Sequence, residues 1–347
     1  METICVEASK KYNVLIENNL IDKAGELALS CGLKGKVCVV TDTNVAPIYL
    51  ARVKKSLSDS GFEVCEYIFE SGEKSKNAQN FIEILNFLAK NHFTRTDSVF
   101  ALGGGVAGDL AGFSAASYMR GINFVQIPTS LLAMVDSSVG GKTAIDLEAG
   151  KNLAGAFYQP EFVLIDPMVL STLPKEFLND AMAEIIKYAM ITKNKLPKLL
   201  VEENITEIIA ECVRIKSEIV HKDEFEGGVR RFLNFGHTAA HAIEALSEFK
   251  ITHGNAVAMG MRIITKAWEN RGLCEKGTLS YLEKELEKNS LMNKCEFKAE
   301  ALCAVCANDK KLEGSTLNLV VPLEIGRCEV QKIKLEELTD ILKEGID

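Results

Sequence analysis

The sequence lacks the features that would direct the protein to nucleic acid or into a membrane. Its 347 residues carry a net charge of −8, so the chain as a whole does not attract polyanions. The longest apolar run, residues 99–119, is interrupted by Asp109 and several glycines, which argues against a membrane span. Internal repeats and low-complexity tracts are absent as well. The remaining composition, 47% hydrophobic and 25% charged, is that of a globular protein with room for two domains.

Paired cysteines and a leader segment are also missing. Ten cysteines are scattered along the chain, and the only close pair is Cys303 and Cys306. That pair lies in an apolar helical pattern without a second pair, which favours buried helix cysteines over a metal or redox role. The start, Met1-Glu2-Thr3-Ile4, is neither basic nor apolar. Free cysteines without a secretory leader predict a protein of the reducing cytoplasm.

The first half of the chain alternates short apolar, β-branched segments with helical patterns. Such alternation predicts a parallel sheet flanked by helices. The expected strands are 36–41, 62–69, 98–102, 124–127 and 162–165, and the expected helices are 44–60, 77–91 and 106–118. Residues 2–7 and 12–16 are expected to form a hairpin at the sheet edge.

Helical periodicity dominates after Asp166-Pro167, from about 174 to 308, and only 316–321 has the pattern of a strand. Pro174 suits the first turn of the first helix there. The predicted fold class is therefore α/β, with a Rossmann-like N-terminal domain and a parallel sheet in residues 1–170. A mostly α-helical C-terminal domain is expected in residues 171–347.

A glycine-rich turn lies between an expected strand and an expected helix. Gly103, Gly105 and Gly108 satisfy GxGxxG, in which glycines let the backbone approach a pyrophosphate at a helix N-terminus. The fingerprint is only half met, because residues 125–128, about twenty positions on, contain no acid. A tight turn is the structural alternative. Asp42, after the first parallel strand, is another candidate for ribose recognition, with a helix N-cap as its alternative.

A second glycine-bearing segment spans residues 128–160 and contains Gly-Gly-Lys-Thr at 140–143. It is not a Walker A loop, because the first glycine of that motif would stand at position 136, which is Asp. Lys142, Lys151 and Asn152 among flexible glycines favour an anion-binding segment over a solvated loop.

Histidine is scarce, yet three of the five histidines fall between residues 237 and 253. His237 and His241 have the i, i+4 spacing of an HExxH zinc site, but Thr238 stands where the general-base glutamate would be. This excludes a simple zinc-protease motif. His253 precedes another expected helix. A glutamate with two or three histidines would suit Zn²⁺ and leave one position open, whereas capping or core histidines are the alternative.

Charged residues near this cluster add to the pattern. Glu184 and Lys187 are three apart on one helical face, and Glu184 lies in an apolar run, where an unpaired carboxylate is costly to bury. A surface ion pair is the alternative. Lys216, Arg230 and Asn234 add cations and an amide, which would bind an anionic, oxygen-rich small molecule.

Taken together, these motifs resemble the 3-dehydroquinate synthase family. The similar segments extend over nearly the whole chain and are long and irregular: residues 71–76, 103–112, 117–121, 128–143, 150–160, 183–188, 223–242 and 308–311.

The resemblance implies a set of site residues. Glu184, His237 and His253 are expected to bind the metal, Zn²⁺ or Co²⁺, and His241 is assigned to the substrate. The NAD site is expected to involve Asp42, Asn44, Glu73, Lys76, Gly105, Asp109, Thr129, Lys142, Lys151 and Thr172. Substrate and catalytic contacts are expected from Asp136, Lys142, Asn152, Lys187, Lys216, Arg230, Asn234, His241 and Lys310, or Lys311 in place of Lys310. An arginine at the place of Arg120 can reach across a dimer interface in such enzymes, which implies a homodimer.

The implied reaction converts 3-deoxy-D-arabino-heptulosonate 7-phosphate to 3-dehydroquinate and phosphate in the shikimate pathway of aromatic amino acid biosynthesis. It combines transient NAD-dependent oxidation at C5, phosphate elimination, re-reduction, ring opening and an internal aldol closure, with no net NADH.

Two positions depart from the family pattern, and three other functions compete. Asp146 stands where Asn is usual and is expected to face away from the anion pocket; Ala240 replaces a common glycine. Other sugar-phosphate cyclases are disfavoured because Lys216, Asn234 and His241 are retained. A metal-dependent NAD polyol dehydrogenase would leave the lysines of 142–152 unexplained, and a non-catalytic sensor would be expected to lose a metal ligand.

Overall fold

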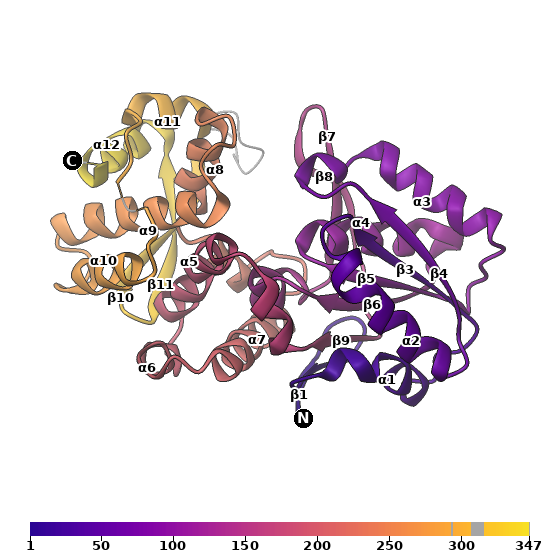
Figure 1. The fold of residues 1–347 in the computed structure, drawn as a ribbon. Helices are drawn as coiled ribbons and strands as arrows, with labels where there is room; N and C mark the ends of the chain where they lie inside the picture. Colours follow the sequence, from indigo (N-terminus) through magenta and orange to yellow (C-terminus); the bar gives the residue numbers. More distant parts are fainter. Residues whose placement is uncertain (293, 307–315, 347) are drawn as a thin grey trace. The chain divides into compact units, whose positions relative to one another are not determined.

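The computed structural model describes residues 1–292, 294–306 and 316–346, which fold as two compact units (Figure 1). Unit 1 comprises Met1–Leu173 and Ile205–Phe225, and unit 2 comprises Pro174–Asn204 and Glu226–Asp347. The sequence predicted a single domain boundary near residue 170. The structure differs, because the chain returns to unit 1 at Ile205–Phe225. This return arises because α7 (Ile205–Lys222) packs against the N-terminal strands, where Ser217 Oγ donates to Cys5 O at 3.0 Å.

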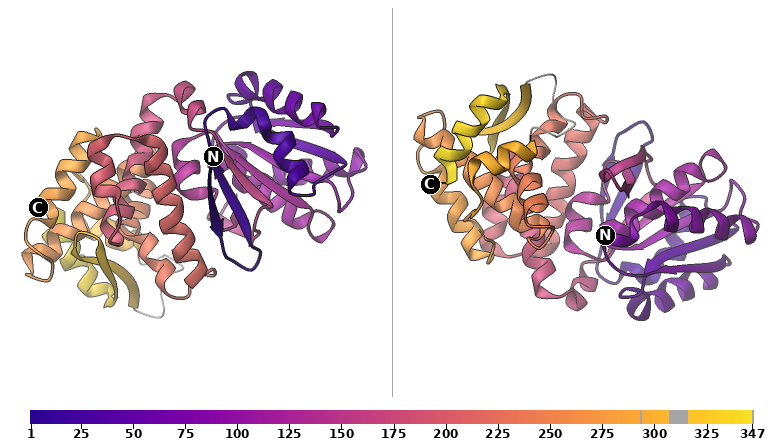
Figure 2. Two further views of the ribbon diagram at one scale, coloured as in Figure 1. Left: turned by 90° about the horizontal axis from the view of Figure 1, so that it is seen from below. Right: turned by 90° about the horizontal axis from the view of Figure 1, so that it is seen from above.

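A seven-stranded sheet in the order β1-β2-β9-β6-β5-β3-β4 forms the frame of unit 1. Only β1 and β2 pair antiparallel in it, and they lie at one edge, as Figure 2 shows beside the N-terminus. The strands are β1 (Glu2–Val6), β2 (Tyr12–Ile16), β3 (Lys36–Asp42), β4 (Glu63–Phe69), β5 (Ser98–Gly103), β6 (Asn123–Pro128) and β9 (Phe162–Ile165). Interior strands are buried on both faces, which explains their nearly continuous apolar runs. The predicted parallel sheet and edge hairpin are confirmed.

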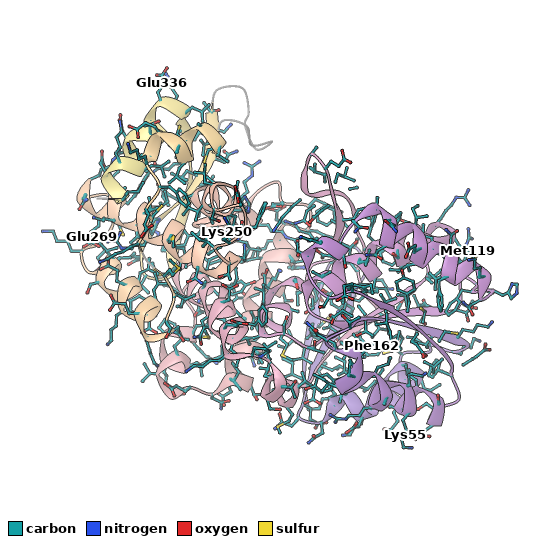
Figure 3. All side chains as sticks on the ribbon, turned by 45° about the horizontal axis from the view of Figure 1, so that its top comes forward. Lys55, Met119, Phe162, Lys250, Glu269 and Glu336 are labelled. Atoms are coloured by element: carbon teal, nitrogen blue, oxygen red, sulfur yellow. The ribbon has the colours of Figure 1, made fainter. Side chains whose placement is uncertain are left out.

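Helices cover both faces of this sheet, with α3 and α4 on one side and α1 and α2 on the other (Figure 1). Their bounds are α1 (Ala24–Ser30), α2 (Ala51–Asp59), α3 (Ala78–Lys90) and α4 (Gly105–Ser117). Short 3-10 or π helices accompany them: η1 (Leu20–Lys23), η2 (Ala46–Leu50), η3 (Glu73–Ser75), η4 (Tyr118–Arg120), η5 (Ala133–Ser137) and η6 (Pro167–Thr172). Figure 3 shows buried Phe162 among the strands and exposed Lys55 and Met119 at the periphery.

The glycine-bearing segment after β6 contains a hairpin that the sequence pattern did not predict. Strands β7 (Lys142–Leu147) and β8 (Gly150–Phe157) pair antiparallel. The hairpin is held on α4, where a Cβ on Gly112 would lie 2.4 Å from Thr143 Cγ2. Glycine therefore permits the close contact between helix and hairpin.

Unit 2 is mostly helical, as predicted. It contains α5 (Lys175–Ile191), α6 (Leu196–Glu202), η7 (Val229–Asn234), α8 (His237–Leu246), α9 (His253–Asn270), α10 (Thr278–Lys288), α11 (Ala299–Cys306) and α12 (Leu335–Ile346), with a hairpin of β10 (Thr316–Glu324) and β11 (Arg327–Lys334). Helix α9 packs against α5, α8, α10 and α12 and buries Trp268. The strand expected at 316–321 is confirmed, whereas β11 was not predicted. Cys303 and Cys306 do lie on a helix, and Cys306 is buried.

Within residues 1–292, 294–306 and 316–346, no helix combines the length and apolar character that a membrane crossing requires.

Candidate active site

Three helices of unit 2 bring a carboxylate and two imidazoles to one point. Glu184 lies in the middle of α5, His237 begins α8 and His253 begins α9. Glu184 Oε1 is 3.4 Å from His237 Nε2 and 3.2 Å from His253 Nε2. One potential ligand atom from each residue lies within 4.8 Å of the other two. Such a set of two nitrogens and one oxygen fits a divalent ion of the Zn²⁺ type and leaves a coordination position open.

Glycines beside the two histidines let these helices approach closely. A Cβ on Gly254 would lie 1.9 Å from Asp180 O of α5, and one on Gly260 would lie 2.1 Å from Gly236 O. Gly236 itself has φ 80°, a left-handed conformation that glycine adopts without strain. The helix crossings that align His237 and His253 therefore depend on the absence of side chains at these positions.

Glu184 and Lys187 are a buried pair rather than the surface ion pair that the spacing also allowed. Their side chains are 1% and 2% exposed, and Lys187 Nζ contacts Glu184 Oε2 directly. Burial would raise the pKa of Glu184, but Lys187 and the neighbouring histidines outweigh it and hold that pKa well below its usual value. Glu184 is therefore ionised, with Oε1 facing the histidines and Oε2 facing the lysine.

Each histidine of the trio has an acceptor at its second ring nitrogen. His237 Nδ1 is 3.1 Å from Phe235 O, and His253 Nδ1 is 3.4 Å from Glu244 Oε1. Burial lowers the pKa of His237. Burial would also lower the pKa of His253, but Glu184 and Glu244 together raise it to about 10. With a metal bound, the acceptors at Nδ1 would take the remaining ring proton of each histidine and leave Nε2 to the metal.

The other predicted residues of unit 2 lie on α8 and η7 or outside the described residues. The ring of His241 is 5.6 Å from that of His237, at 87°, and its side chain is exposed, outside the group of three ligand atoms. Arg230 in η7 is only 1% exposed. Asn234, at the end of η7, donates from Nδ2 to Glu226 Oε1 at 2.6 Å. Lys310 and Lys311 lie outside the described residues.

In unit 1, Lys216 and Asp136 meet although they are far apart in sequence. Lys216, on α7, donates from Nζ to Asp136 O at 2.6 Å and to Asp136 Oδ1 at 2.7 Å. Lys216 is 5% exposed, so its charge needs such partners. The contact places a cation at η5, within the segment 128–160 for which anion binding was predicted.

The sheet order reverses between β3 and β5, and predicted NAD residues lie at that point. Asp42 ends β3, Gly103 ends β5, and a Cβ on Gly103 would lie 3.5 Å from Asp42 Oδ2. In open α/β sheets such a reversal, at the carboxyl ends of the strands, is where ligands bind. The structural alternatives also hold in part: Asp42 Oδ1 accepts from the amides of Asn44 at 2.8 Å and Val45 at 3.0 Å.

The glycines of GxGxxG serve packing as well. A Cβ on Gly103 would lie 2.7 Å from Ala107 Cβ, and one on Gly108 would lie 2.8 Å from Gln126 Oε1. Gly105 begins α4 and is less crowded than the other two, because a Cβ there would lie 3.4 Å from its nearest neighbour, Ser137 Oγ. Close packing therefore accounts for Gly103 and Gly108, whereas Gly105 is less crowded.

Lys76 is the centre of a charged cluster in unit 1. It is 5% exposed, and its Nζ lies 2.9 Å from Glu73 Oε1, 3.3 Å from Asp109 Oδ2 and 3.8 Å from Asp146 Oδ1. Lys151 Nζ is 3.9 Å from the same Glu73 oxygen. Burial raises the pKa of Asp109 to about 6, although Lys76 opposes the shift. Asp146, which was expected to face away from the anion pocket, thus contributes a third carboxylate beside Lys76.

The remaining predicted residues occupy several elements of unit 1. Thr129 donates its amide to Gly103 O at 2.9 Å, and Thr172 Oγ1 lies 2.6 Å from the Tyr49 hydroxyl. Exposed side chains on β7, β8 and η4 complete the set: Lys142, Asn152 and Arg120.

Two residues that the sequence pattern did not single out also contact the predicted group. Glu226 accepts from Asn234, and Glu244 faces His253. Glu244 carries a signal in retrospect, because it follows His237 by seven positions and His241 by three, which puts all three on one face of α8.

Comparison with known proteins assigns the chain to a family. Residues 66–180 match the model of the 3-dehydroquinate synthase N-terminal region, and residues 181–312 match that of the C-terminal region. A 3-dehydroquinate synthase of Clostridium acetobutylicum is 42% identical, with 99% of both chains covered.

Solved structures show the same fold at lower identity. A 2-deoxy-scyllo-inosose synthase complexed with carbaglucose-6-phosphate, NAD⁺ and Co²⁺ aligns with TM-score 0.89 and 22% identity over 99% of this chain and 100% of that chain. The 2-epi-5-epi-valiolone synthase of Streptomyces hygroscopicus with NAD⁺ and Zn²⁺ aligns with TM-score 0.85 and 23% identity over 98% of each chain. Because both parts of the family model and a nearly full-length relative match, the chain belongs to the 3-dehydroquinate synthase family.

Proposed function

We propose that the protein converts 3-deoxy-D-arabino-heptulosonate 7-phosphate to 3-dehydroquinate and phosphate, with NAD⁺ and a divalent metal as cofactors. The observation that carries the proposal is the 42% identity to a 3-dehydroquinate synthase over 99% of both chains. The reaction belongs to the shikimate pathway, and the enzyme is a carbon–oxygen lyase that releases phosphate.

Glu184, His237 and His253 would hold the metal, which we propose to be Zn²⁺ or Co²⁺. Their ligand atoms lie within 4.8 Å of one another, and similar folds have been solved with these two ions. When bound, the metal supplies a Lewis acid for the C5 oxygen of the substrate, and NAD⁺ supplies the hydride acceptor. Ionised Glu184 and the Nε2 atoms of the two histidines are the donors that this role requires.

The NAD site would lie at the strand-order reversal of unit 1. Asp42 at the end of β3 would accept from a ribose hydroxyl, and Gly105 at the start of α4 would let the backbone approach a pyrophosphate. The full proposed group also includes Asn44, Glu73, Lys76, Asp109, Thr129, Lys142, Lys151 and Thr172.

The substrate carries a carboxylate and a phosphate, so the chain must supply several cations. Lys142, Lys187, Lys216, Arg230 and Lys310 would supply the cations. Asn152, Asn234 and His241 would supply hydrogen bonds, and Asp136 would hold Lys216. Buried Lys216 and Arg230 are suited to fixed anion contacts because they are held among protein groups before the substrate arrives. The imidazole of His241, exposed beside His237, is suited to carry a proton at the substrate.

We further propose a homodimer of the cytoplasm. The ten cysteines are free thiols, as a reducing compartment would keep them. Arg120 is exposed at the end of η4 with φ 65°, where it would serve a neighbouring subunit. Sedimentation equilibrium would test the dimer, and restored activity on mixing an Arg120→Ala variant with an inactive His237→Ala variant would test the sharing of Arg120.

Phosphate release without NADH accumulation tests the main proposal. With NAD⁺ and Zn²⁺ or Co²⁺, the protein should release inorganic phosphate from the heptulosonate phosphate while absorbance at 340 nm stays flat. Steady NADH formation from a polyol would instead indicate a dehydrogenase. Turnover of another sugar phosphate in preference to this one would indicate a different cyclase.

A further inference from the structure

Helix α8 supplies more than a histidine to the cluster in unit 2. His237, His241 and Glu244 follow one another at i, i+4 and i+7, so all three lie on one helical face. Glu244 reaches across to α9, where its Oε1 lies 3.4 Å from Nδ1 of His253. The opposite ring nitrogen of His253, Nε2, lies 3.2 Å from Glu184 Oε1. The imidazole thus lies between two carboxylates, one at each nitrogen.

Burying the carboxylate of Glu244 carries a free-energy cost that its partners must offset. The residue is only 7% exposed, and burying a carboxylate is unfavourable by several kcal/mol unless charged or hydrogen-bonding partners offset it. His253 is a partner that can donate a proton to it. An uncharged residue of similar size would fill the same space without this cost, so packing alone does not explain a glutamate here.

A neutral imidazole carries one proton, and the acceptors around the ring decide which nitrogen holds it. When a metal ion occupies Nε2, the single proton of the ring must lie on Nδ1, where Glu244 is within reach to accept it in a hydrogen bond. His237 has a different kind of acceptor at its Nδ1, the backbone carbonyl of Phe235. A carboxylate is the stronger acceptor, so it also makes the ring a stronger donor to a cation.

We propose that Glu244 is a positioning residue for the metal centre, which fixes the tautomer and ring orientation of His253 and strengthens its Nε2 as a ligand. The proposal rests on the proposed metal dependence. Glu244 contacts a ligand rather than the ion or the substrate, so its effect should appear in metal affinity before any turnover is measured.

Metal affinity of the full chain tests this role. The protein is freed of metal with a chelator, and Zn²⁺ is titrated in competition with a chromophoric chelator. Glu244→Ala should weaken Zn²⁺ binding by about 10- to 100-fold, as outer-shell substitutions do. Glu244→Gln keeps an acceptor oxygen without the charge and should restore part of the loss. The absorption spectrum of bound Co²⁺ should shift in Glu244→Ala and return toward that of the unsubstituted protein in Glu244→Gln.

Matched controls separate this role from general destabilisation. Glu285, on α10, is equally buried at 7% exposure, and Glu285→Ala and Glu285→Gln should leave Zn²⁺ affinity unchanged. Equal affinities for Glu244→Ala, Glu244→Gln and the unsubstituted protein would overturn the proposal, as would the same loss in the Glu285 variants. If Glu244→Ala does not fold, the affinity and spectrum of Glu244→Gln decide. Failure of the unsubstituted protein to bind Zn²⁺ or Co²⁺ would overturn the metal dependence itself, which distinguishes the two failures.

Discussion

The two units assemble their candidate residues in different ways. In unit 2, three side chains from α5, α8 and α9 converge because glycines allow the helices to cross closely. In unit 1, the candidate residues lie at strand ends and on a hairpin, and the charged ones share several partners, as Lys76 does with three carboxylates. The arrangement in unit 2 depends on a few contacts that no other residue can replace. The arrangement in unit 1 distributes its charged contacts over many residues.

This difference ranks the expected effects of substitution. A single change in unit 2 should remove a ligand or separate two helices, and little nearby can compensate. A single change in unit 1 should leave other groups to bind the same ligand. The following predictions test that ranking, beginning with the largest effect.

The largest effect is expected for His237→Ala, which removes one of three metal ligands. Turnover and bound metal should both be lost. His241→Ala should reduce kcat by roughly 10²- to 10⁴-fold, the range for loss of a proton-transferring group, while metal content stays unchanged. Elemental analysis beside steady-state kinetics separates the two. Loss of metal from both variants would instead make the i, i+4 histidine pair the metal site.

The next effect concerns the helix crossing itself. Alanine favours helices over glycine by about 1 kcal/mol, so Gly254→Ala would stabilise α9 if space were available. The built Cβ lies 1.9 Å from Asp180 O, however, so the clash should dominate and lower the free energy of unfolding by about 1–3 kcal/mol.

Gly254→Ala should also weaken metal binding, because α5 carries Glu184 and α9 begins at His253. Urea unfolding and metal content measure the two consequences. Gly272→Ala is the control: its φ is 69° and a Cβ there meets nothing within 4 Å, so it should cost stability only and keep the metal. An unchanged metal content in Gly254→Ala would show that the site tolerates a shift of α9.

A smaller effect is expected at Asp42 in unit 1, where two roles can be separated. Asp42→Asn keeps an oxygen for the amides of Asn44 and Val45, so stability should hold, whereas Asp42→Ala should lose about 1 kcal/mol. Both variants should weaken NAD binding by roughly 10- to 100-fold, the value of a hydrogen bond to a charged group. Calorimetric titration with NAD⁺ measures this. Undiminished affinity in Asp42→Asn would leave Asp42 a turn residue only.

The same contrast explains what the sequence could predict. The sheet of unit 1 follows from local signals, because each buried strand is a continuous apolar run with a helix pattern after it. Asp42 and Gly103 could therefore be assigned to strand ends before the structure was known. The β7–β8 hairpin could not, since its glycines resemble a flexible segment and its pairing depends on packing against α4 through Gly112.

The metal centre was less accessible to sequence patterns. Spacing alone predicted His237 and His241 as a ligand pair, because an i, i+4 spacing indicates which residues share a face of one helix. It does not indicate which residues of other helices lie nearby. Glu184 lies on another helix, and its position opposite His253 depends on crossings at Gly236, Gly254 and Gly260. Family resemblance indicated Glu184. Glu244 carried only its spacing to His237 and His241 as a signal, because the partner that gives it a role, His253, begins a different helix.

The smallest effect is expected at Asp146, where the shared charges of unit 1 can be tested directly. Asp146→Asn removes one of the carboxylates beside Lys76 but keeps the oxygen that accepts from the amide of Asn152 at 2.8 Å. Lys76 should then attract a pyrophosphate more strongly. The Asp146 side chain is 21% exposed and 3.8 Å from Lys76 Nζ, so the interaction is worth at most about 1 kcal/mol. The Kd for NAD⁺ should fall by up to about fivefold, and less at high salt.

Glu148→Gln is the matched control for that change, because it alters the net charge equally from an exposed position on the same hairpin. If both variants tighten NAD⁺ binding to the same degree, net charge rather than contact with Lys76 is responsible. If Asp146→Asn weakens binding, the negative charge of Asp146 supports NAD⁺ binding through its contact with Lys76. In that case unit 1, like unit 2, would depend on one contact without a substitute, and the difference between the units would be one of degree.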